Sequence, residues 1–248
     1  DINKAIYYFS LAANQNHPIA QLKLGVYYLV GGIVSKDINK GMYYLTLASN
    51  QNNAEAQYYL GDVYLTNEII PQNINKAIHY LSLAASQMYP EALYDLGYIY
   101  EKGEYVKMDI DKAIHYYLLA ANQNNSSAQL NLGVIYFKGQ YVAQDFDKAV
   151  YYFSLSANQN NPNAQYNLGH YYQKNKLLDK AIYYYTLAAN QGQENAQINL
   201  GLIFLNDNSG HQNVEKAIYY LSLAANQNDQ DAQFNLGVIY LDGKYISR

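Results

Sequence analysis

Apolar residues recur at three- and four-residue spacings in two stretches of every repeat of about 36 residues, and this is the spacing of a helix face. The first stretch, residues 1–15, carries Ile2, Ala5, Phe9 and Ala12 on one face. The second stretch, residues 18–30, carries Ala20, Leu24 and Tyr28 on one stripe. The pattern therefore predicts a pair of helices in each repeat.

The same motif recurs seven times along the 248 residues. Its lysines are Lys4, Lys40, Lys76, Lys112, Lys148, Lys180 and Lys216, at spacings of 36, 36, 36, 36, 32 and 36 residues. Units that recur at such a period stack on their neighbours. The sequence predicts seven stacked pairs that start near residues 1, 37, 73, 109, 145, 177 and 213. The first helix of each pair is named the Lys-Ala helix and the second the Leu-Gly helix, after residues that recur in them.

Polar residues at the expected helix ends support this assignment. Short side chains that cap helix N-termini precede the Lys-Ala helices at Asp1, Asp37, Asn73, Asp109, Asp145 and Asn213. The Lys-Ala helices are followed by residues that tolerate the left-handed conformation at the helix end: Asn16, Asn52, Asn124, Asn160, Gly192 and Asn228. Met88 occupies this position in one repeat and is the exception. The first turn of the Leu-Gly helices begins with proline at Pro18, Pro90 and Pro162.

Each Leu-Gly helix also carries a glycine in its interior, which costs about 1 kcal/mol relative to alanine. Seven such glycines, Gly25 through Gly237, predict close approach of a neighbouring helix. Large side chains are expected to fill the space beside them. The column proposed for this role is Tyr8, Tyr44, Tyr80, Tyr116, Tyr152, Tyr184 and Tyr220.

The motifs A-Q-x-x-L-G-x-x-Y and D-x-x-K-A-x-x-Y-x-x-x-A-A resemble the Sel1-like repeat, a relative of the tetratricopeptide repeat, and the resemblance covers the whole chain. It implies an all-α, right-handed α-solenoid of seven helix pairs in one domain, residues 1–248. The family's loop glycine is present at Gly31, Gly103, Gly139 and Gly243. The interval from Leu168 to Ala181 is four residues shorter than in the longer repeats, so residues 173–178 are expected to form a tight turn.

By comparison with the family's repeat unit, the chain starts part-way through a repeat, at a Lys-Ala helix. Ile2, Ile6 and Phe9 have no preceding helix to pack against. Stacked repeats bury their cores against neighbours and need polar caps at their ends. We therefore expect a fragment of a longer solenoid, or a chain with ends beyond the structure.

The composition excludes several classes of function. A net charge of −4 with 15% charged residues provides no basic stripe for nucleic acid. The absence of cysteine excludes disulfides, thiolate nucleophiles and cysteine-bound zinc. No run of eighteen apolar residues is present, so no membrane insertion is predicted. The sequence indicates neither organism nor compartment.

Candidate catalytic residues are few. No phosphate-binding glycine loop, metalloprotease motif or nucleophile elbow is present. His79 and His115 share a column that holds tyrosine in the other repeats, which indicates a flat amphipathic side chain rather than a metal ligand. We predict that the chain is not an enzyme and that it holds no metal or cofactor.

One candidate binding surface lies on the Leu-Gly helices, which line the concave face of related solenoids. The position after each glycine, and the position seven residues before it, vary far more than their neighbours. From these columns we select Glu55, Asp62, Glu91, Tyr98, Val134, Asn163 and His170 as partner-binding residues. The first four would make an acidic, aromatic patch suited to a basic or extended peptide. Alternatively, these positions are solvated and vary freely.

The second candidate surface is a ribbon on the Lys-Ala helices. Two columns four residues apart lie on one helix face and contain Tyr43, Leu47, His79, Leu83, His115, Leu119, Tyr151 and Leu155. An exposed apolar ribbon marks an interface, and its repetition favours a second copy of the chain. In a first alternative, these residues are buried in the core between repeats. In a second, the tyrosine content reflects the base composition of the source genome.

The Sel1-like family is associated with the assembly of protein complexes. By this resemblance we predict a protein-binding scaffold or adaptor that uses its concave face. The competing prediction is a structural protein that self-associates through the Tyr and Leu ribbon.

Overall fold

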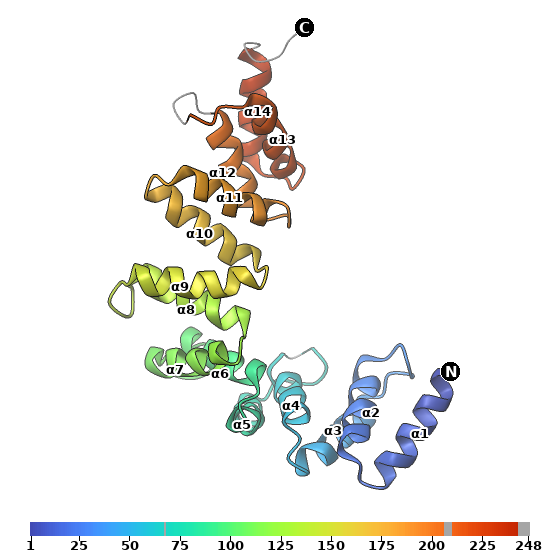
Figure 1. Ribbon diagram of the computed structural model, residues 1–248. Coiled ribbons are helices and arrows are strands. Elements are labelled where there is room, and N and C mark those ends of the chain that lie inside the picture. Colours follow the sequence, from blue (N-terminus) through green and yellow to red (C-terminus); the bar gives the residue numbers. More distant parts are fainter. Residues whose placement is uncertain (67, 206–209, 243–248) are drawn as a thin grey trace. The chain divides into compact units, whose positions relative to one another are not determined.

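A computed structural model describes residues 1–66, 68–205 and 210–242, and this part of the chain consists of helices joined by turns and loops, with no strand (Figure 1). Its fourteen helices are α1 (Ile2–Asn14), α2 (Pro18–Val30), α3 (Ile38–Asn50), α4 (Ala54–Thr66), α5 (Ile74–Ser86), α6 (Pro90–Lys102), α7 (Ile110–Asn122), α8 (Ser126–Lys138), α9 (Phe146–Asn158), α10 (Pro162–Lys174), α11 (Leu178–Ala189), α12 (Glu194–Leu205), α13 (Val214–Ala225) and α14 (Gln230–Asp242). The seven helix pairs of an α-solenoid are confirmed. None of these helices has the length and apolar character needed to cross a bilayer.

The chain divides into two compact units, Asp1–Ala128 and Gln129–Arg248. Unit 1 contains α1 to α7 and the start of α8. Unit 2 contains the rest of α8 and α9 to α14. Within each unit, a Leu-Gly helix packs most extensively against the Lys-Ala helix that follows it, as α2 packs against α3 and α10 against α11.

The predicted helix caps are present. At each of the six predicted N-caps the side-chain oxygen accepts a hydrogen bond from the backbone N–H three residues later. The three prolines occupy the first turn of α2, α6 and α10. The N-terminus of α11 differs, because its cap residue Leu177 forms no side-chain hydrogen bond. This difference arises in the shortened repeat, where the capping Asp or Asn has been lost.

The turns after the Lys-Ala helices adopt the left-handed conformation predicted for them. Their φ angles run from 61° at Asn16 to 84° at Gly192. Met88 adopts the same conformation, with φ of 60°, although it has a bulky side chain. The tight turn of the shortened repeat is formed with Lys176 at φ of 60°. Of the loop glycines, Gly243 lies outside the described residues.

The interior glycines of the Leu-Gly helices allow the next helix to approach, as predicted, but the expected tyrosine column does not fill the space. A Cβ atom at Gly25 would lie 2.7 Å from Cγ of Leu45, and one at Gly133 would lie 2.4 Å from Cδ1 of Phe153. The residues that pack on these glycines are Leu45, Leu81, Tyr117, Phe153, Tyr185 and Leu221. This column lies one position after the predicted one, because the helix turns that position toward the preceding Leu-Gly helix.

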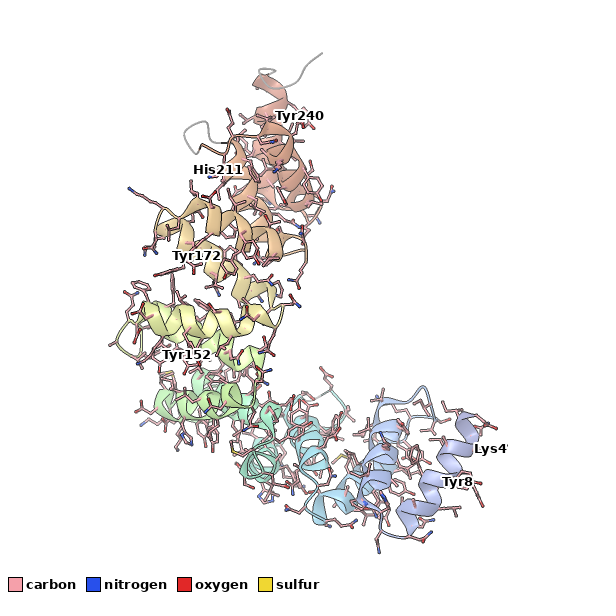
Figure 2. The ribbon with its side chains drawn as sticks, in the orientation of Figure 1. Lys4, Tyr8, Tyr152, Tyr172, His211 and Tyr240 are labelled. Atoms are coloured by element: carbon pink, nitrogen blue, oxygen red, sulfur yellow. The ribbon has the colours of Figure 1, made fainter. Side chains whose placement is uncertain are left out.

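The predicted tyrosine column instead forms a repeated aromatic stack. Each of these rings, from Tyr44 to Tyr220, lies parallel to an aromatic ring of the preceding Leu-Gly helix, with centroids 5.5–6.0 Å apart. The motif lysine lies over the ring contributed by the Leu-Gly helix. The Lys112 ammonium, for example, is 5.0 Å from the centroid of Tyr100. Figure 2 labels two members of this array, Tyr152 and Tyr172. The array is a cation–π and stacking contact that joins the two helices in six repeats.

The buried glutamine of the Leu-Gly helix joins consecutive repeats. Gln57 donates from Nε2 to the carbonyl of Ser49 at 3.4 Å and accepts at Oε1 from Nε2 of Gln87 at 2.8 Å. The same link joins Gln21 to Gln51, Gln129 to Gln159, Gln165 to Gln191 and Gln197 to Gln227. Leu93 stands in this column in α6 and has no polar atom to offer.

Candidate binding surface

In unit 1 the Leu-Gly helices α2 and α4 are in contact. A groove of about 220 Å³ lies between these two helices and is lined by Ile19, Leu22, Lys23, Val26, Tyr27, Glu55 and Tyr59. Ile19 and Val26 belong to the two variable columns selected from the sequence, as does Glu55. The variable positions of α2 and α4 therefore meet at a groove.

Four carboxylates gather on α4 and α6 of the same surface. Glu55, Asp62 and Glu91 were selected from the sequence, and the structure adds Asp95, which lies close enough to Asp62 and Glu91 to feel their charges. Glu55 and Glu91 are exposed, while Asp62 and Asp95 are partly buried. No ion pair among the described residues involves any of these four carboxylates. The cluster therefore carries an uncompensated negative charge, and we name it the acidic cluster.

Burial and neighbouring carboxylates raise the pKa values of two of these groups. Burial, followed by the charges of Asp62 and Glu91, raises the pKa of Asp95 to about 7. Burial and then Glu68 raise the pKa of Asp62. Both shifts show that the carboxylate form is disfavoured in the absence of a cation.

Tyrosines surround the acidic cluster. The rings of Tyr58 and Tyr89 lie 5.2 Å apart, and Tyr58 also contacts Tyr59 at 5.7 Å. Burial, followed by the charges of Glu91 and Glu55, raises the pKa of Tyr89 to about 12, so this phenol stays neutral. The fourth predicted residue, Tyr98, is 44% exposed and lies under the ammonium of Lys102 at 5.2 Å. This surface thus combines carboxylates with neutral aromatic hydroxyls.

The three predicted residues of unit 2 have different surroundings. His170 is exposed, stacks on Tyr166 at 6.4 Å and lines a groove of about 440 Å³ between α10 and α12. Asn163 is exposed in the first turn of α10. Val134 is partly buried against the core around Phe153 and Leu168. Of the three, only His170 lines the groove.

The residues predicted from the sequence do not include the column that contains Asp95. Its members are Lys23, Tyr59, Asp95, Asn131, Asn167, Asn199 and Asn235. It lies four residues after one selected column and three before the other, and therefore on the same helix face. Its variation between charged, aromatic and amide residues was a signal that could have identified it.

The ribbon on the Lys-Ala helices divides into an exposed and a partly buried column. Tyr43 and Tyr151 are 59% and 58% exposed, and His79 and His115 are exposed beside Tyr80 and Tyr116. The leucine column is partly buried at Leu47, Leu83, Leu119 and Leu155. Among the described residues, no group of three or more His, Cys, Asp or Glu side chains is placed to hold a metal ion.

Comparison with solved structures identifies the same architecture elsewhere. The chain is similar to a protective antigen of uropathogenic Escherichia coli strains that displays an SLR fold, with 31% identity and a TM-score of 0.85 over 96% of this chain. It spans 52% of that antigen structure. It is also similar to a Sel1 repeat protein of Oxalobacter formigenes, with 28% identity and a TM-score of 0.82, over 96% of this chain and 70% of that one. No match was found among curated protein sequences.

The Sel1 repeat family model matches eight successive segments of the chain. They are residues 1–17, 18–53, 54–87, 90–125, 126–161, 162–193, 195–229 and 230–248. The family repeat begins at the Leu-Gly helix, so the first and last segments hold α1 and α14 alone. This register agrees with the dense packing of each Leu-Gly helix on the Lys-Ala helix that follows. The chain belongs to the Sel1 repeat family.

Proposed function

We propose that this chain is a non-catalytic protein-binding scaffold that holds a basic, extended peptide segment against the Leu-Gly helices of unit 1. Sel1 repeat proteins are generally protein-interaction scaffolds, and their fold is typically non-enzymatic. The observation that carries the finer proposal is the acidic cluster, in which Glu55, Asp62, Glu91 and Asp95 have no cationic partner among the described residues.

Charge complementarity defines the chemistry of the ligand. A lysine or arginine side chain placed among these carboxylates would stabilise the ionised form of Asp95, which burial and the charges of Asp62 and Glu91 disfavour. The neighbouring tyrosines supply ring faces for the aliphatic stems of such side chains and hydroxyls for the peptide backbone. The groove between α2 and α4 continues the surface from Glu55 and Tyr59.

The test is a titration of the full chain with a fluorescently labelled peptide in which lysines alternate with serines, followed by anisotropy. Asp62→Lys combined with Tyr98→Ala is expected to weaken binding at least about 10-fold, since it reverses one charge and removes one aromatic surface. Asp111→Lys makes the same charge change at an exposed site on α7 and should leave affinity within about twofold.

Salt should weaken binding to the wild-type chain, because the charges at the surface are partly exposed. Circular dichroism confirms that the variants fold. Equal loss in the double variant and in Asp111→Lys, or no binding by the wild-type chain, would exclude the acidic cluster as the docking site.

Self-association through the Lys-Ala helices is a second candidate, favoured by the exposure of Tyr43 and Tyr151. Size-exclusion chromatography with light scattering over a range of concentrations tests it. If the ribbon is an interface, replacing both tyrosines by serine should convert dimers or polymers to monomers without unfolding. A wild-type chain that stays monomeric at every concentration would eliminate this candidate. Replacement of Leu83, Leu119 and Leu155 by lysine then distinguishes interface leucines, which keep the fold, from core leucines, which do not.

A further inference from the structure

The groove of unit 2 differs in its chemistry from the surface of unit 1. Its lining residues are Tyr166, His170, Gln173, Lys174 and Asn199, and no carboxylate is among them. Four of the five come from α10, where they recur at helical spacing on one face, and Asn199 comes from α12. Helix α10 contains no acidic residue along its whole length. The groove therefore has the opposite charge character to the acidic cluster.

The polar groups of the groove are held in place by a buried tyrosine. Tyr185 is fully buried, and its hydroxyl donates to Oε1 of Gln173 at 2.7 Å while it accepts from Nδ2 of Asn199 at 3.2 Å. Because the Gln173 oxygen is occupied in this way, the side chain presents its amide N–H groups as donors. Tyr166 stacks on His170 with an interplanar angle of 5° and also contacts the Tyr185 ring at 5.8 Å. The groove is preorganised, which lowers the entropic cost of binding.

Lys174 supplies the charge at this groove. Its ammonium forms no ion pair among the described residues and lies 6.0 Å from the centroid of Phe146. In unit 1 the lysine at the equivalent position, Lys102, lies 3.7 Å from a carboxylate oxygen of Glu101. The residue that corresponds to Glu101 in α10 is Gln173, so Lys174 lacks this partner. Its charge is available to an incoming carboxylate.

We propose that the groove between α10 and α12 binds an acidic peptide segment, in which an Asp or Glu side chain pairs with Lys174. The Gln173 amide donates to a peptide carbonyl, and the stacked Tyr166 and His170 rings pack against the segment. This inference rests on the proposed function, since it assumes that Leu-Gly helices bind peptides. It adds a second site of opposite selectivity: unit 1 takes basic segments and unit 2 takes acidic ones.

Two labelled probes of equal length test this inference on the full chain. One alternates glutamate with serine, and the other alternates lysine with serine. Lys174→Glu is expected to weaken binding of the acidic probe about 5- to 10-fold, from loss of one ion pair and the repulsion that replaces it. Lys174→Arg should retain affinity within about twofold, because it keeps the charge. Lys107→Glu, an exposed site in unit 1, is the matched charge control and should have little effect.

The two probes separate the two proposals. Binding of the basic probe without binding of the acidic one overturns the inference about unit 2 and leaves the proposed function intact. Failure of both probes overturns both. Equal weakening of the acidic probe by Lys174→Glu and Lys107→Glu also overturns the inference, because it indicates attraction by net charge alone. Unchanged binding of the basic probe to Lys174→Glu shows that this variant is folded and that the two sites are independent.

Discussion

Gly97 of α6 lies against the ring of Tyr117 of α7, so closely that a Cβ atom at residue 97 would come within 2.6 Å of Cδ1 of that ring. Tyr117 is fully buried, and its hydroxyl donates to Oε2 of Glu101 at 2.7 Å. The ring is therefore held by its contact with Gly97 and by the hydrogen bond of its hydroxyl. Helix packing in this repeat depends on the absence of a side chain at residue 97.

Gly97→Ala is predicted to destabilise the fold by up to about 2 kcal/mol. Overpacking a core costs about 1–3 kcal/mol, and the better helix propensity of alanine returns about 1 kcal/mol. Gly237→Ala is the matched control, since no described atom lies within 4 Å of a Cβ at that position. It should be neutral or stabilising. Thermal unfolding followed by circular dichroism measures both, and equal effects would contradict the packing explanation.

Met88→Asn is predicted to stabilise the chain by about 0.5–1 kcal/mol. Met88 has φ of 60°, a conformation that asparagine tolerates better than a long side chain. The methionine is 38% exposed, and the buried part of its surface that is lost on replacement offsets part of this gain. The reciprocal change, Asn52→Met at the equivalent turn with φ of 61°, should destabilise by at least this amount, because it also removes the acceptor of Gln57 and Gln87. Urea unfolding midpoints of the two variants should move in opposite directions.

Gln57→Leu is predicted to destabilise the chain by about 1–2 kcal/mol, because it removes the acceptor of Gln87 and the donor to the Ser49 carbonyl. The natural leucine at residue 93 provides the comparison. Leu93→Gln introduces the same group one repeat later, beside Gln123 at the equivalent spacing. Leu93→Gln should lower the free energy of unfolding by less than an ordinary polar substitution in a core. Thermal unfolding compares the two, and a larger loss for Leu93→Gln would contradict the proposed link between repeats.

The acidic cluster predicts a pH-dependent stability. The pKa of Asp95 is about 7 in the folded chain and near 4 when unfolded, so the folded chain binds the extra proton between these values. Stability should therefore fall as pH rises from about 4 through about 7. Asp95→Asn removes this titration and should gain on the order of 2 kcal/mol over the wild type at about pH 8, but little at about pH 4. Melting temperatures at the two pH values test the sign, and a constant difference would contradict it.

The same titration affects the basic probe. Ionised Asp95 attracts a cation, whereas protonated Asp95 does not, so affinity should rise between about pH 6 and about pH 8. Asp95→Asn should flatten this rise. Anisotropy titrations at the two pH values measure it, and an unchanged slope in the variant would assign the pH dependence to another group.

The local features of this fold were readable from the chain because each depends on residues close in sequence. The N-caps act over three residues, as Asp109 does on the Lys112 amide, and the left-handed turns depend on one residue each. Because Lys, Ala, Leu and Gly recur with the same 36-residue period, these signals do not arise by chance. The grouping of Glu55 with Asp62 was also predictable, since residues seven apart share a helix face.

The contacts between repeats required the structure. The column that packs on the glycines lies one residue after the predicted column. One residue corresponds to a rotation of about 100° around the helix axis. Which of the two columns faces the glycines therefore depends on how the two helices pack. Asp95 joins the acidic cluster because the fold brings it close enough to Asp62 of the preceding repeat to feel its charge, and the link from Gln57 to Gln87 spans 30 residues. The helices, their caps and the repeat follow from local sequence signals. Which side chains meet depends on how the helices pack, and no local periodicity specifies those contacts.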